Sequence, residues 1–381
     1  MSYIHDWARE SRARQRQASY VIRQLRRSSP TVERVPGLTS HISRAPCILM
    51  STTALPKWLS ATWCRSYIRR MTAEGVLGER NSSVSVRYLQ TLADGHAFDL
   101  RIANDFALPE KCTGLEDLNE EHLQLLASGA IEAFAGVTTA EAGDGEWTLA
   151  WHAAFSFPPL LGATDDPQSL LSRIAAGEHE TDDVGRAVPT LPDGRRKPVT
   201  HWLEHAPDGS YEEEWLTFEQ YFAQGAHLAA LRPASGDCGT CWLAILGSTF
   251  AFVRDIDRRA LPAVAQNRPM AEVLADDAIP VDAKRKLLDC EFSFGRFGQN
   301  GGVGGVVEAT SLPWCKGVAL AVLIGVADAW VPVRPSDAPV LTKAIDAIRA
   351  DHEKACAELR AAEENGQAGI ADMLRARGAV A

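Results

Sequence analysis

Three residues capable of metal binding or acid–base chemistry lie close together as His201, Glu204 and His205, in the order H-x-x-E-H. Inverted zinc proteases use this order to present two histidines and a glutamate to one metal ion. That geometry requires a helix, but Pro198 precedes the motif and Pro207 closes it, and the segment between them alternates like a strand. On a strand the histidines share one face and Glu204 points to the other. We therefore expect surface histidines and no metal site.

An acidic and aromatic run, from Tyr211 to Trp215, follows the next turn. On a strand, Tyr211, Glu213 and Trp215 share one face, and the two remaining glutamates share the other. One interpretation places Glu212 and Glu214 on a solvated outer face. The other places Glu213 between two aromatic side chains inside a barrel, where a buried charge demands a partner.

Other aromatic and charged residues have a spacing that suits a pocket. Trp147, Trp151 and Phe155 alternate with period two, which predicts an aromatic wall on one side of a barrel. Arg101 or Arg296 is the expected partner of the central glutamate in the acidic run. The candidate ligand-binding residues are Arg101, Trp147, Trp151, Phe155, Tyr211, Glu213, Trp215, Glu291 and Arg296.

Two further motifs resemble known sites but lack the required context. Cys238 and Cys241 form a C-x-x-C pair, but a strand-like WLAIL follows instead of a helix, and Cys290 and Cys315 supply no second close pair for zinc. The glycine-rich stretch Gly295–Gly305 lacks phosphate-loop spacing and predicts a hairpin loop or a flap at a barrel mouth. No G-x-S-x-G elbow marks a nucleophile. We expect no cofactor and assign no catalytic residue.

Charge and composition exclude several classes of protein. The net charge of −10 argues against a nucleic-acid partner, because such proteins carry a basic surface. The longest apolar run, Val318–Trp330, is interrupted by Asp328 and is shorter than the roughly 20 residues that span a bilayer. Eight cysteines without regular spacing indicate reduced thiols, so we expect a soluble, cytoplasmic protein.

The first 49 residues differ from the rest of the chain. Residues 1–80 hold 14 Lys and Arg against 5 Asp and Glu, whereas the remainder is strongly acidic. The start is rich in arginine and serine, a composition shared by mitochondrial transit peptides and by disordered tails. Met50 is an alternative initiator. We expect residues 1–49 to be a basic leader outside the fold, and its import into mitochondria stays open.

Most of the body alternates with period two, which predicts antiparallel strands. The first hairpin pairs Ser83–Leu92 with His96–Ala103 through an Asp-Gly turn. Helices are expected at Leu115–Ala127, Met270–Leu274, Val281–Leu288 and Ala338–Glu364, and a long loop at Gly162–Lys197. The other expected strands are Ile131–Val137, Glu146–Phe157, Pro198–His205, Ser210–Phe218, His227–Leu231, Thr240–Leu246, Thr249–Arg254, Leu288–Phe297, Val303–Ser311 and Val318–Val326. Without a βαβ rhythm, this pattern favours an antiparallel barrel or sandwich.

Several segments in this order resemble an uncharacterised family of microbial proteins built from tandem lipocalin-like β-barrels. The segments are SVRYLQT, FDLRI, EAFAG, HWLEHAPDGSYEEEW, LLDCEFSFGR and TSLPWCKG. The resemblance covers about residues 55–330 and implies a mainly β fold with one or two lipocalin-like barrels. We expect a leader at 1–49, a first barrel domain at 50–220, a second at 221–335 and a C-terminal helical tail at 336–381.

Three functions are compatible with a barrel of this kind. The first is binding of a small hydrophobic or aromatic molecule with a polar handle, because small barrels can enclose one ligand. The second is an isomerase, cyclase or lyase that uses the same cavity, with Glu213, Glu291 or a histidine as the acid–base group. The third is a protein-interaction scaffold with filled barrels and a partner bound through the C-terminal helix.

Overall fold

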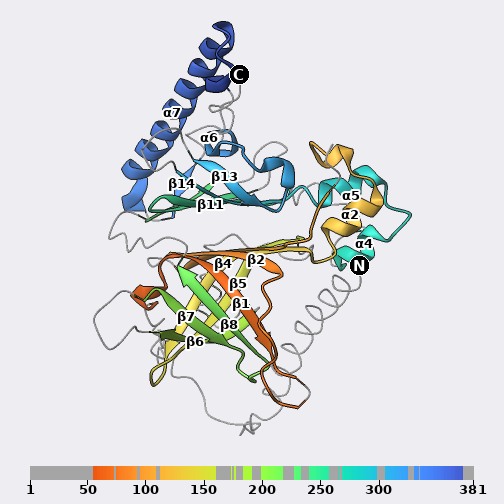
Figure 1. The fold of residues 1–381 in the computed structure, drawn as a ribbon, viewed down its shortest axis with the longest axis vertical. Helices are drawn as coiled ribbons and strands as arrows, with labels where there is room; N and C mark the ends of the chain where they lie inside the picture. The colour runs from red at the N-terminus through yellow and green to blue at the C-terminus, as the bar shows by residue number, and fades with distance from the viewer. Residues whose placement is uncertain are drawn as a thin grey trace, which may run out of the picture.

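A computed structural model gives the fold of the chain. It describes residues 55–72, 74–91, 95–108, 112–159, 173, 176, 183–190, 199–217, 227–232, 240–256, 265, 268–297, 305–324, 330–333 and 335–371. The basic leader, Cys238, and most of the glycine-rich stretch therefore lie outside the described residues. The described part is mainly antiparallel β structure with a few helices, as the sequence predicts (Figure 1).

Eight strands close into a barrel in which each strand pairs with its neighbours along the chain. The barrel closes because the first strand also pairs antiparallel with the eighth. Closure leaves no unpaired edge, so every strand exposes one face to the interior and one to the exterior. The strands are β1 (Thr62–Arg70), β2 (Val84–Gln90), β3 (His96–Ala103), β4 (Ile131–Ala142), β5 (Trp147–Phe157), β6 (Asp183–Thr190), β7 (His201–His205) and β8 (Tyr211–Thr217).

A bulge between β4 and β5 reverses the alternation of β5. Ala135 pairs with Phe155 and Gly136 pairs with Ala153, so one residue of β5 is left over. Gly136 is required here, because a Cβ at this position would lie 1.9 Å from the carbonyl oxygen of His152. Beyond the bulge, β5 turns the side chain of Phe155 out of the barrel.

The second half of the chain forms an open sheet instead of a second barrel. Its strand order is β13-β12-β11-β10-β9-β14, so the two outermost strands do not pair with each other. The segment expected as a further strand, Val318–Val326, contains the short helix α6 (Leu320–Ile324). The strands are β9 (His227–Arg232), β10 (Cys241–Leu246), β11 (Thr249–Arg254), β12 (Glu291–Arg296), β13 (Val306–Thr310) and β14 (Val331–Pro332).

The two β units pack through a shared apolar core. Trp242 of β10 is buried, and its ring centroid lies 4.8 Å from that of Phe98 and 5.8 Å from that of Phe155 on the barrel exterior. These residues belong to one core cluster that spans both units. The outer faces of β3, β4 and β5 therefore form a buried surface, which explains why these faces are largely apolar.

Helices flank the second sheet and support it. Helices α2 (Glu120–Leu126), α4 (Met270–Leu274) and α5 (Val281–Leu287) lie together beside the two β units, and Lys284 Nζ is 2.7 Å from Glu120 Oε1 (Figure 1). Helix α7 (Ala338–Glu364) covers the sheet face opposite the barrel, where Leu341, Ile345 and Ile348 join a core cluster with Phe250 and Phe252. None of the helices in the described ranges is both long and apolar enough to cross a bilayer.

Candidate ligand cavity inside the barrel

A narrow cavity lies inside the eight-stranded barrel. Its open volume is about 10 Å³, which is room for about one water molecule. The lining comes from seven of the eight strands, which is the arrangement expected for the inward-facing residues of a small barrel. The lining residues are Tyr88, Asp99, Arg101, Phe134, Trp151, Asp183, Trp202, Glu204 and Trp215.

A layer of tryptophans closes one side of the cavity. The rings of Trp202 and Trp215 stack with centroids 5.5 Å apart and an interplanar angle of 7°. Trp63 meets Trp202 edge-on at 6.1 Å, and Trp58 lies 5.9 Å from Trp202. Trp58 belongs to the short helix η1 (Lys57–Leu59), and Trp63 Nε1 donates a hydrogen bond to the carbonyl oxygen of Leu59 (2.9 Å). The helix and the tryptophans therefore form a fixed base of the cavity.

Glu204 supplies a buried carboxyl group to this cavity. Its side chain is only 4% exposed, and its oxygens accept hydrogen bonds from Tyr211 Oη (2.9 Å) and Trp215 Nε1 (3.0 Å). No Lys, Arg or His of the described residues lies within salt-bridge distance of it. Burial raises the pKa of Glu204 to about 8, and the charges of Glu213 and Asp183 add to the increase. The group is therefore mostly protonated at neutral pH.

Two ion pairs neutralise two further inward-facing carboxylates, Glu213 and Asp99. Arg65 Nη1 lies 2.5 Å from Glu213 Oε1, and both side chains are almost completely buried. Arg101 holds Asp99 through two hydrogen bonds of 3.0 and 3.1 Å. Burial raises the pKa of Asp99, whereas the Arg101 charge opposes the increase. Burial alone would lower the pKa of Arg101, but the charges of Asp99 and Glu213 raise it well above its ordinary value.

A hydrogen-bond network links the inward-facing residues of β2, β4 and β5. Trp151 Nε1 donates to Tyr88 Oη (3.0 Å), and Tyr88 Oη donates to Gln90 Oε1. Thr138 Oγ1 also donates to Gln90 Oε1 (2.7 Å). Burial raises the pKa of Tyr88 well above its ordinary value, so the hydroxyl stays protonated and serves as a neutral hydrogen-bonding group.

The indole N–H of Trp202 is a buried donor without an acceptor. Trp202 is fully buried, and no hydrogen-bond acceptor in the described residues reaches its Nε1. An unsatisfied buried donor costs about 1–3 kcal/mol. Such groups are rare in folded proteins and call for an explanation, which includes a missing ligand or water. Trp202 is also one of the residues that line the cavity.

The structure brings together some of the residues predicted from the sequence and separates others. Arg101, Trp151 and Trp215 line the cavity, and Tyr211 donates a hydrogen bond to the lining residue Glu204, whereas Glu213 pairs with Arg65, which does not line the cavity. Trp147 belongs to the barrel's inner cluster but does not line the cavity. The remaining three, Phe155, Glu291 and Arg296, lie outside the barrel.

The salt-bridge partner of Glu213 differs from the two alternatives that the sequence suggested. Arg65 of β1 pairs with Glu213, although Arg101 and Arg296 were the expected partners. Arg296 instead pairs with Glu308 of β13 through Nε at 2.7 Å. The reason is register: Glu213 is paired with Ile68, and a β-bulge between Arg65 and Tyr67 brings Arg65 to the same inner face.

Six lining residues were not predicted from the sequence, and the alternation in one strand could have identified two of them. Glu204 and Trp202 alternate with half-buried His201 and His205, so the face opposite the histidines had to be the interior. The H-x-x-E-H segment is strand β7, and among the described residues no group of His, Cys, Asp and Glu could hold a metal ion. The other lining residues absent from the prediction are Tyr88, Asp99, Phe134 and Asp183.

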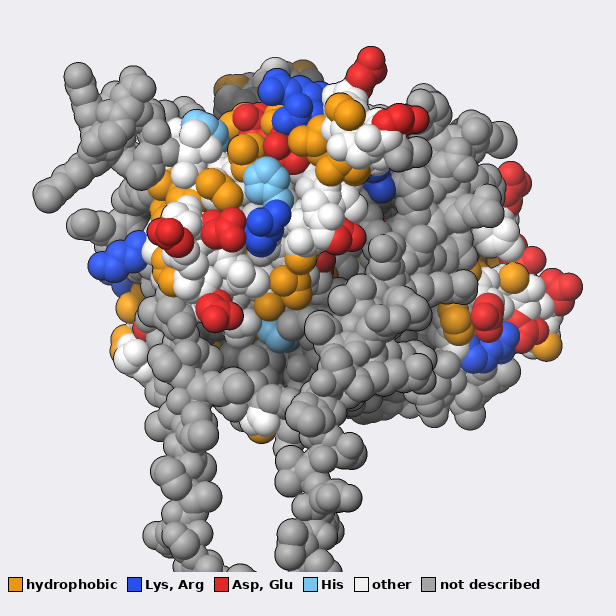
Figure 2. Space-filling model, turned by 90° about the horizontal axis from the view of Figure 1, so that it is seen from below, with side chains coloured by type: hydrophobic (Ala, Val, Ile, Leu, Met, Phe, Trp, Pro, Cys, Tyr) orange, Lys and Arg blue, Asp and Glu red, His pale blue; other side chains and the backbone are white. Residues whose placement is uncertain are grey.

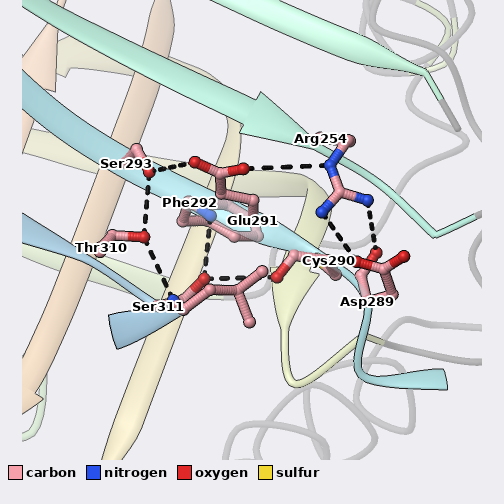
Figure 3. Close-up of polar contacts among 9 residues, drawn as sticks. Arg254, Asp289, Cys290, Glu291, Phe292, Ser293, Thr310 and Ser311 are labelled. Carbon is pink, nitrogen blue, oxygen red and sulfur yellow. Dashed lines mark hydrogen bonds and ion pairs between the residues drawn. The ribbon is translucent and has the colours of Figure 1, made fainter. Parts of the chain in front are cut away.

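A second polar cluster surrounds Glu291 on the other sheet (Figure 3). Its member Ser293 pairs with Phe252, which belongs to the core cluster under α7. Ser293 Oγ donates to Glu291 Oε1 (2.6 Å), and Arg254 Nε lies 3.9 Å from Glu291 Oε2. Burial raises the pKa of Glu291, and burial together with the Glu291 charge raises the pKa of Cys315 to about 12. Such a thiol is not a nucleophile at neutral pH. The contacts tie β11, β12 and β13 together, which is a structural role.

The exterior of the barrel carries mixed charges. Arg69 Nε donates to Glu212 Oε1 (2.9 Å), and Tyr67 Oη donates to the same oxygen (3.0 Å). In the view from below, acidic and basic side chains lie next to hydrophobic and histidine side chains on the described surface (Figure 2). Glu212 is therefore neutralised on the outer face of β8, whereas Glu213 is neutralised on the inner face.

Comparisons with known proteins do not identify a family. No family model and no curated protein matches the chain. Among solved structures, the chain is similar to the crystal structure of uncharacterized protein YLR301w from Saccharomyces cerevisiae, with 12% identity and a TM-score of 0.32. The match covers 66% of this chain and 84% of the yeast chain. A likeness of this degree carries no functional argument.

Proposed function

We propose that this protein binds a small molecule in the cavity of the β1–β8 barrel. The observation that carries the proposal is the convergence of buried polar groups on one empty space. Glu204 has no positive partner there among the described residues, and the Trp202 N–H has no acceptor. Ligand sites typically combine apolar and aromatic walls with a few polar groups that fix orientation.

The dimensions of the cavity limit the ligand. Its open volume of about 10 Å³ holds about one water molecule and lies far below the roughly 300–1,000 Å³ of drug-sized sites. The walls consist of tryptophan, tyrosine and phenylalanine rings together with ionisable side chains. The chemistry of this lining suits a compact molecule with an apolar or aromatic surface and a polar handle, which enters only if the lining side chains move apart. A long acyl chain does not fit, because the tryptophan layer fills one side of the barrel.

Ligand binding can be tested with the tryptophans that line the cavity. In the full chain, a library of neutral, acidic and basic compounds of fewer than about ten heavy atoms should contain members that change tryptophan fluorescence saturably. The Trp151→Phe variant should alter the amplitude of that change, because Trp151 is a lining residue. A flat response across all three charge classes would contradict the proposal.

A second candidate function is catalysis in the same cavity. The observation that favours it is the raised pKa of Glu204, since a carboxyl group that titrates near neutral pH can donate and accept a proton. Tyr211 donates to Glu204 and would hold it in place, which makes Tyr211 a positioning residue. An isomerase or lyase would then show turnover that Glu204→Gln abolishes while ligand binding persists.

A third candidate function is that of a protein-interaction scaffold. The observation in its favour is that tryptophans and ion pairs fill most of the barrel interior and leave only a narrow space. Helix α7 would then offer the partner surface, along the open face that includes Pro339, Lys343 and Asp346. This function gains support only if no small molecule enters the barrel.

A further inference from the structure

Two buried carboxyl groups face each other inside the barrel. Glu204 of β7 is the register partner of Glu213 of β8, so the two side chains project side by side from neighbouring strands. They are only 4% and 2% exposed. Directly opposed residues of an antiparallel pair have Cβ atoms about 5 Å apart, and like charges at that distance destabilise the sheet. The pair therefore tolerates one negative charge more easily than two.

The negative charge of this pair belongs to Glu213. Arg65 Nη1 lies 2.5 Å from Glu213 Oε1, and the arginine side chain is itself only 5% exposed. In the described part of the chain, no cationic side chain forms a salt bridge with Glu204. Burial and the Glu213 charge raise the pKa of Glu204 to about 8. At neutral pH the barrel consequently holds a protonated Glu204 beside an ionised Glu213.

Glu204 is also tied to three aromatic rings of the cavity lining, Tyr88, Trp202 and Trp215, which we call the ring wall. Its oxygens accept hydrogen bonds from Tyr211 Oη (2.9 Å) and Trp215 Nε1 (3.0 Å). The Trp215 ring stacks on Trp202 and lies 5.7 Å from the Tyr88 ring, centroid to centroid. A displacement of the Glu204 carboxyl group therefore reaches the ring wall through Trp215.

The closed barrel has no space to hydrate a second charge. Its cavity has room for about one water molecule. On the β6 side, the Glu204 side chain fills the space beside Gly185, where an added Cβ would lie 2.8 Å from Oε1 and 2.9 Å from Cγ. A buried carboxylate is strongly destabilising unless water or a cation reaches it. Ionisation of Glu204 is therefore relieved when the lining side chains move apart.

The other groups around Glu204 do not remove this conflict. The charged and titratable groups that face it are Tyr211 and Glu213 of β8, Asp183 of β6, and Asp99 and Arg101 of β3. The Arg101 charge and the Tyr211 hydrogen bond favour the ionised form, but burial and the Glu213 charge outweigh them. Arg101 is already bonded to Asp99 at 3.0 and 3.1 Å. Burial raises the pKa of Tyr211 well above its ordinary value, so this hydroxyl remains a neutral donor.

We propose that Glu204 is a proton-operated latch of the barrel. With its proton, the ring wall is closed; without it, the inward side chains of β7 and β8 move apart and water enters. This inference rests on the proposed binding function, because the role of the latch is to regulate entry to the same cavity. A molecule that occupies the barrel binds the open state, so its binding is coupled to proton release.

Fluorine NMR of the full chain labelled with 5-fluorotryptophan tests the opening. The difference in chemical shift between H2O and D2O reports contact of each ring with solvent in the folded protein. Glu204 is about one hundredth ionised at pH 6 and about nine tenths ionised at pH 9. For Trp202 and Trp215 we expect no solvent isotope shift at pH 6 and a clear one at pH 9, with a midpoint near pH 8.

Matched variants and one internal control locate the latch. Glu204→Gln keeps the size of the side chain and does not titrate, so both rings should stay dry at pH 9. Glu214→Gln, on the outer face of β8 opposite Tyr67, should respond as the wild type does. Trp242, buried between the barrel and the second sheet, should show no isotope shift at either pH. Circular dichroism at both pH values confirms that each protein is folded.

Glu213→Gln tests the pairing of the two carboxyl groups. The change removes the opposing charge and releases Arg65, so Glu204 should lose its proton more easily. The midpoint of the opening should therefore fall by at least about one pH unit. An unchanged midpoint in this folded variant would overturn the latch, and Glu204→Gln decides the question if Glu213→Gln does not fold.

The outcomes separate the latch from the binding function. Identical isotope shifts at pH 6 and pH 9, or a pH response that persists in Glu204→Gln, would overturn the latch. Neutral compounds of the library should bind at least about tenfold more tightly at pH 9 than at pH 6. Compounds that bind the barrel equally at both pH values would overturn the latch and leave the binding function in place. If the rings become wet as expected but no compound binds at pH 9, the latch stands and the binding function is wrong.

Discussion

Glu204 is predicted to make the protein less stable as the pH rises. Its pKa is about 8 in the folded protein and 4.5 when the group is free in water. A carboxyl group whose pKa is raised on folding binds a proton more tightly in the folded state, so stability decreases once the unfolded chain releases that proton. The loss begins near pH 4.5 and is complete above pH 8, which is the opposite of the usual behaviour of a salt-bridged acid.

The size of this effect follows from the difference between the two pKa values. Each unit is worth about 1.4 kcal/mol, so the shift corresponds to about 5 kcal/mol in total. Part of this contribution to stability is already lost at pH 5. The free energy of unfolding therefore decreases by about 4 kcal/mol between pH 5 and pH 9. Hydrogen bonds from Tyr211 and Trp215 limit the penalty on the ionised group, and their effect is included in the pKa.

Urea unfolding at pH 5, 7 and 9 measures this contribution when wild type and Glu204→Gln are compared. The glutamine does not titrate. Between pH 5 and pH 9 the variant should therefore lose about 4 kcal/mol less stability than the wild type. Other titrating groups cancel in this comparison. Glu214→Gln, on the outer face, should follow the wild-type profile. Parallel profiles of wild type and Glu204→Gln would refute the assignment of a buried, protonated carboxyl group.

Three further substitutions test the packing around the site by urea unfolding. Glu213→Gln leaves the charge of Arg65 buried and unpaired, so a loss of about 3–5 kcal/mol is expected; a loss below 1 kcal/mol would show that the pair is solvated. Gly136→Ala forces a Cβ against the backbone of the β4–β5 bulge and should cost at least about 3 kcal/mol, whereas Gly369→Ala, in open space, should be neutral or slightly stabilising. Trp242→Ala should cost about 3–5 kcal/mol by opening a cavity between the barrel and the second sheet, and a small loss would mean that the two units are not one core.

The mainly β character and most strand positions could be predicted from the sequence because they depend on local alternation. Glu213 faces inward between Tyr211 and Trp215, as one of the two interpretations of the acidic run required. Helices α4 and α7 begin and end at the predicted residues, since both are marked by proline, apolar spacing and charged ends. These features are encoded within about ten to thirty consecutive residues.

Features that depend on long-range pairing could not be predicted. Strand β6, at Asp183–Thr190, was expected to be loop because Gly185 and Pro189 weaken its strand pattern. The structure explains Gly185, because a Cβ there would lie 2.8 Å from an oxygen of Glu204. Likewise, Phe155 was expected on the aromatic inner wall, but the bulge at Gly136 rotates it outward. A bulge changes the face of every later residue and leaves no clear mark in the sequence.

The second half of the chain illustrates the same limit. Its strands alternate as those of a barrel would, but the segment at Leu320–Ile324 is helical and α7 covers the sheet. Glu291 consequently lies in a cluster with Arg254 and Ser293, in the six-stranded sheet and not in the barrel that holds the cavity. Whether a sheet closes depends on how its first and last strands meet, which local patterns do not specify.

The most direct test of the binding function is an NMR titration of the full chain labelled at the indole nitrogens of tryptophan. With the compound library, the barrel account predicts saturable shifts confined to the indoles of the cavity, above all Trp202, Trp151 and Trp215, with the signal of Trp242 unchanged. If every compound leaves the cavity indoles unmoved, or shifts only indoles outside the barrel, the protein does not bind a small molecule in its barrel.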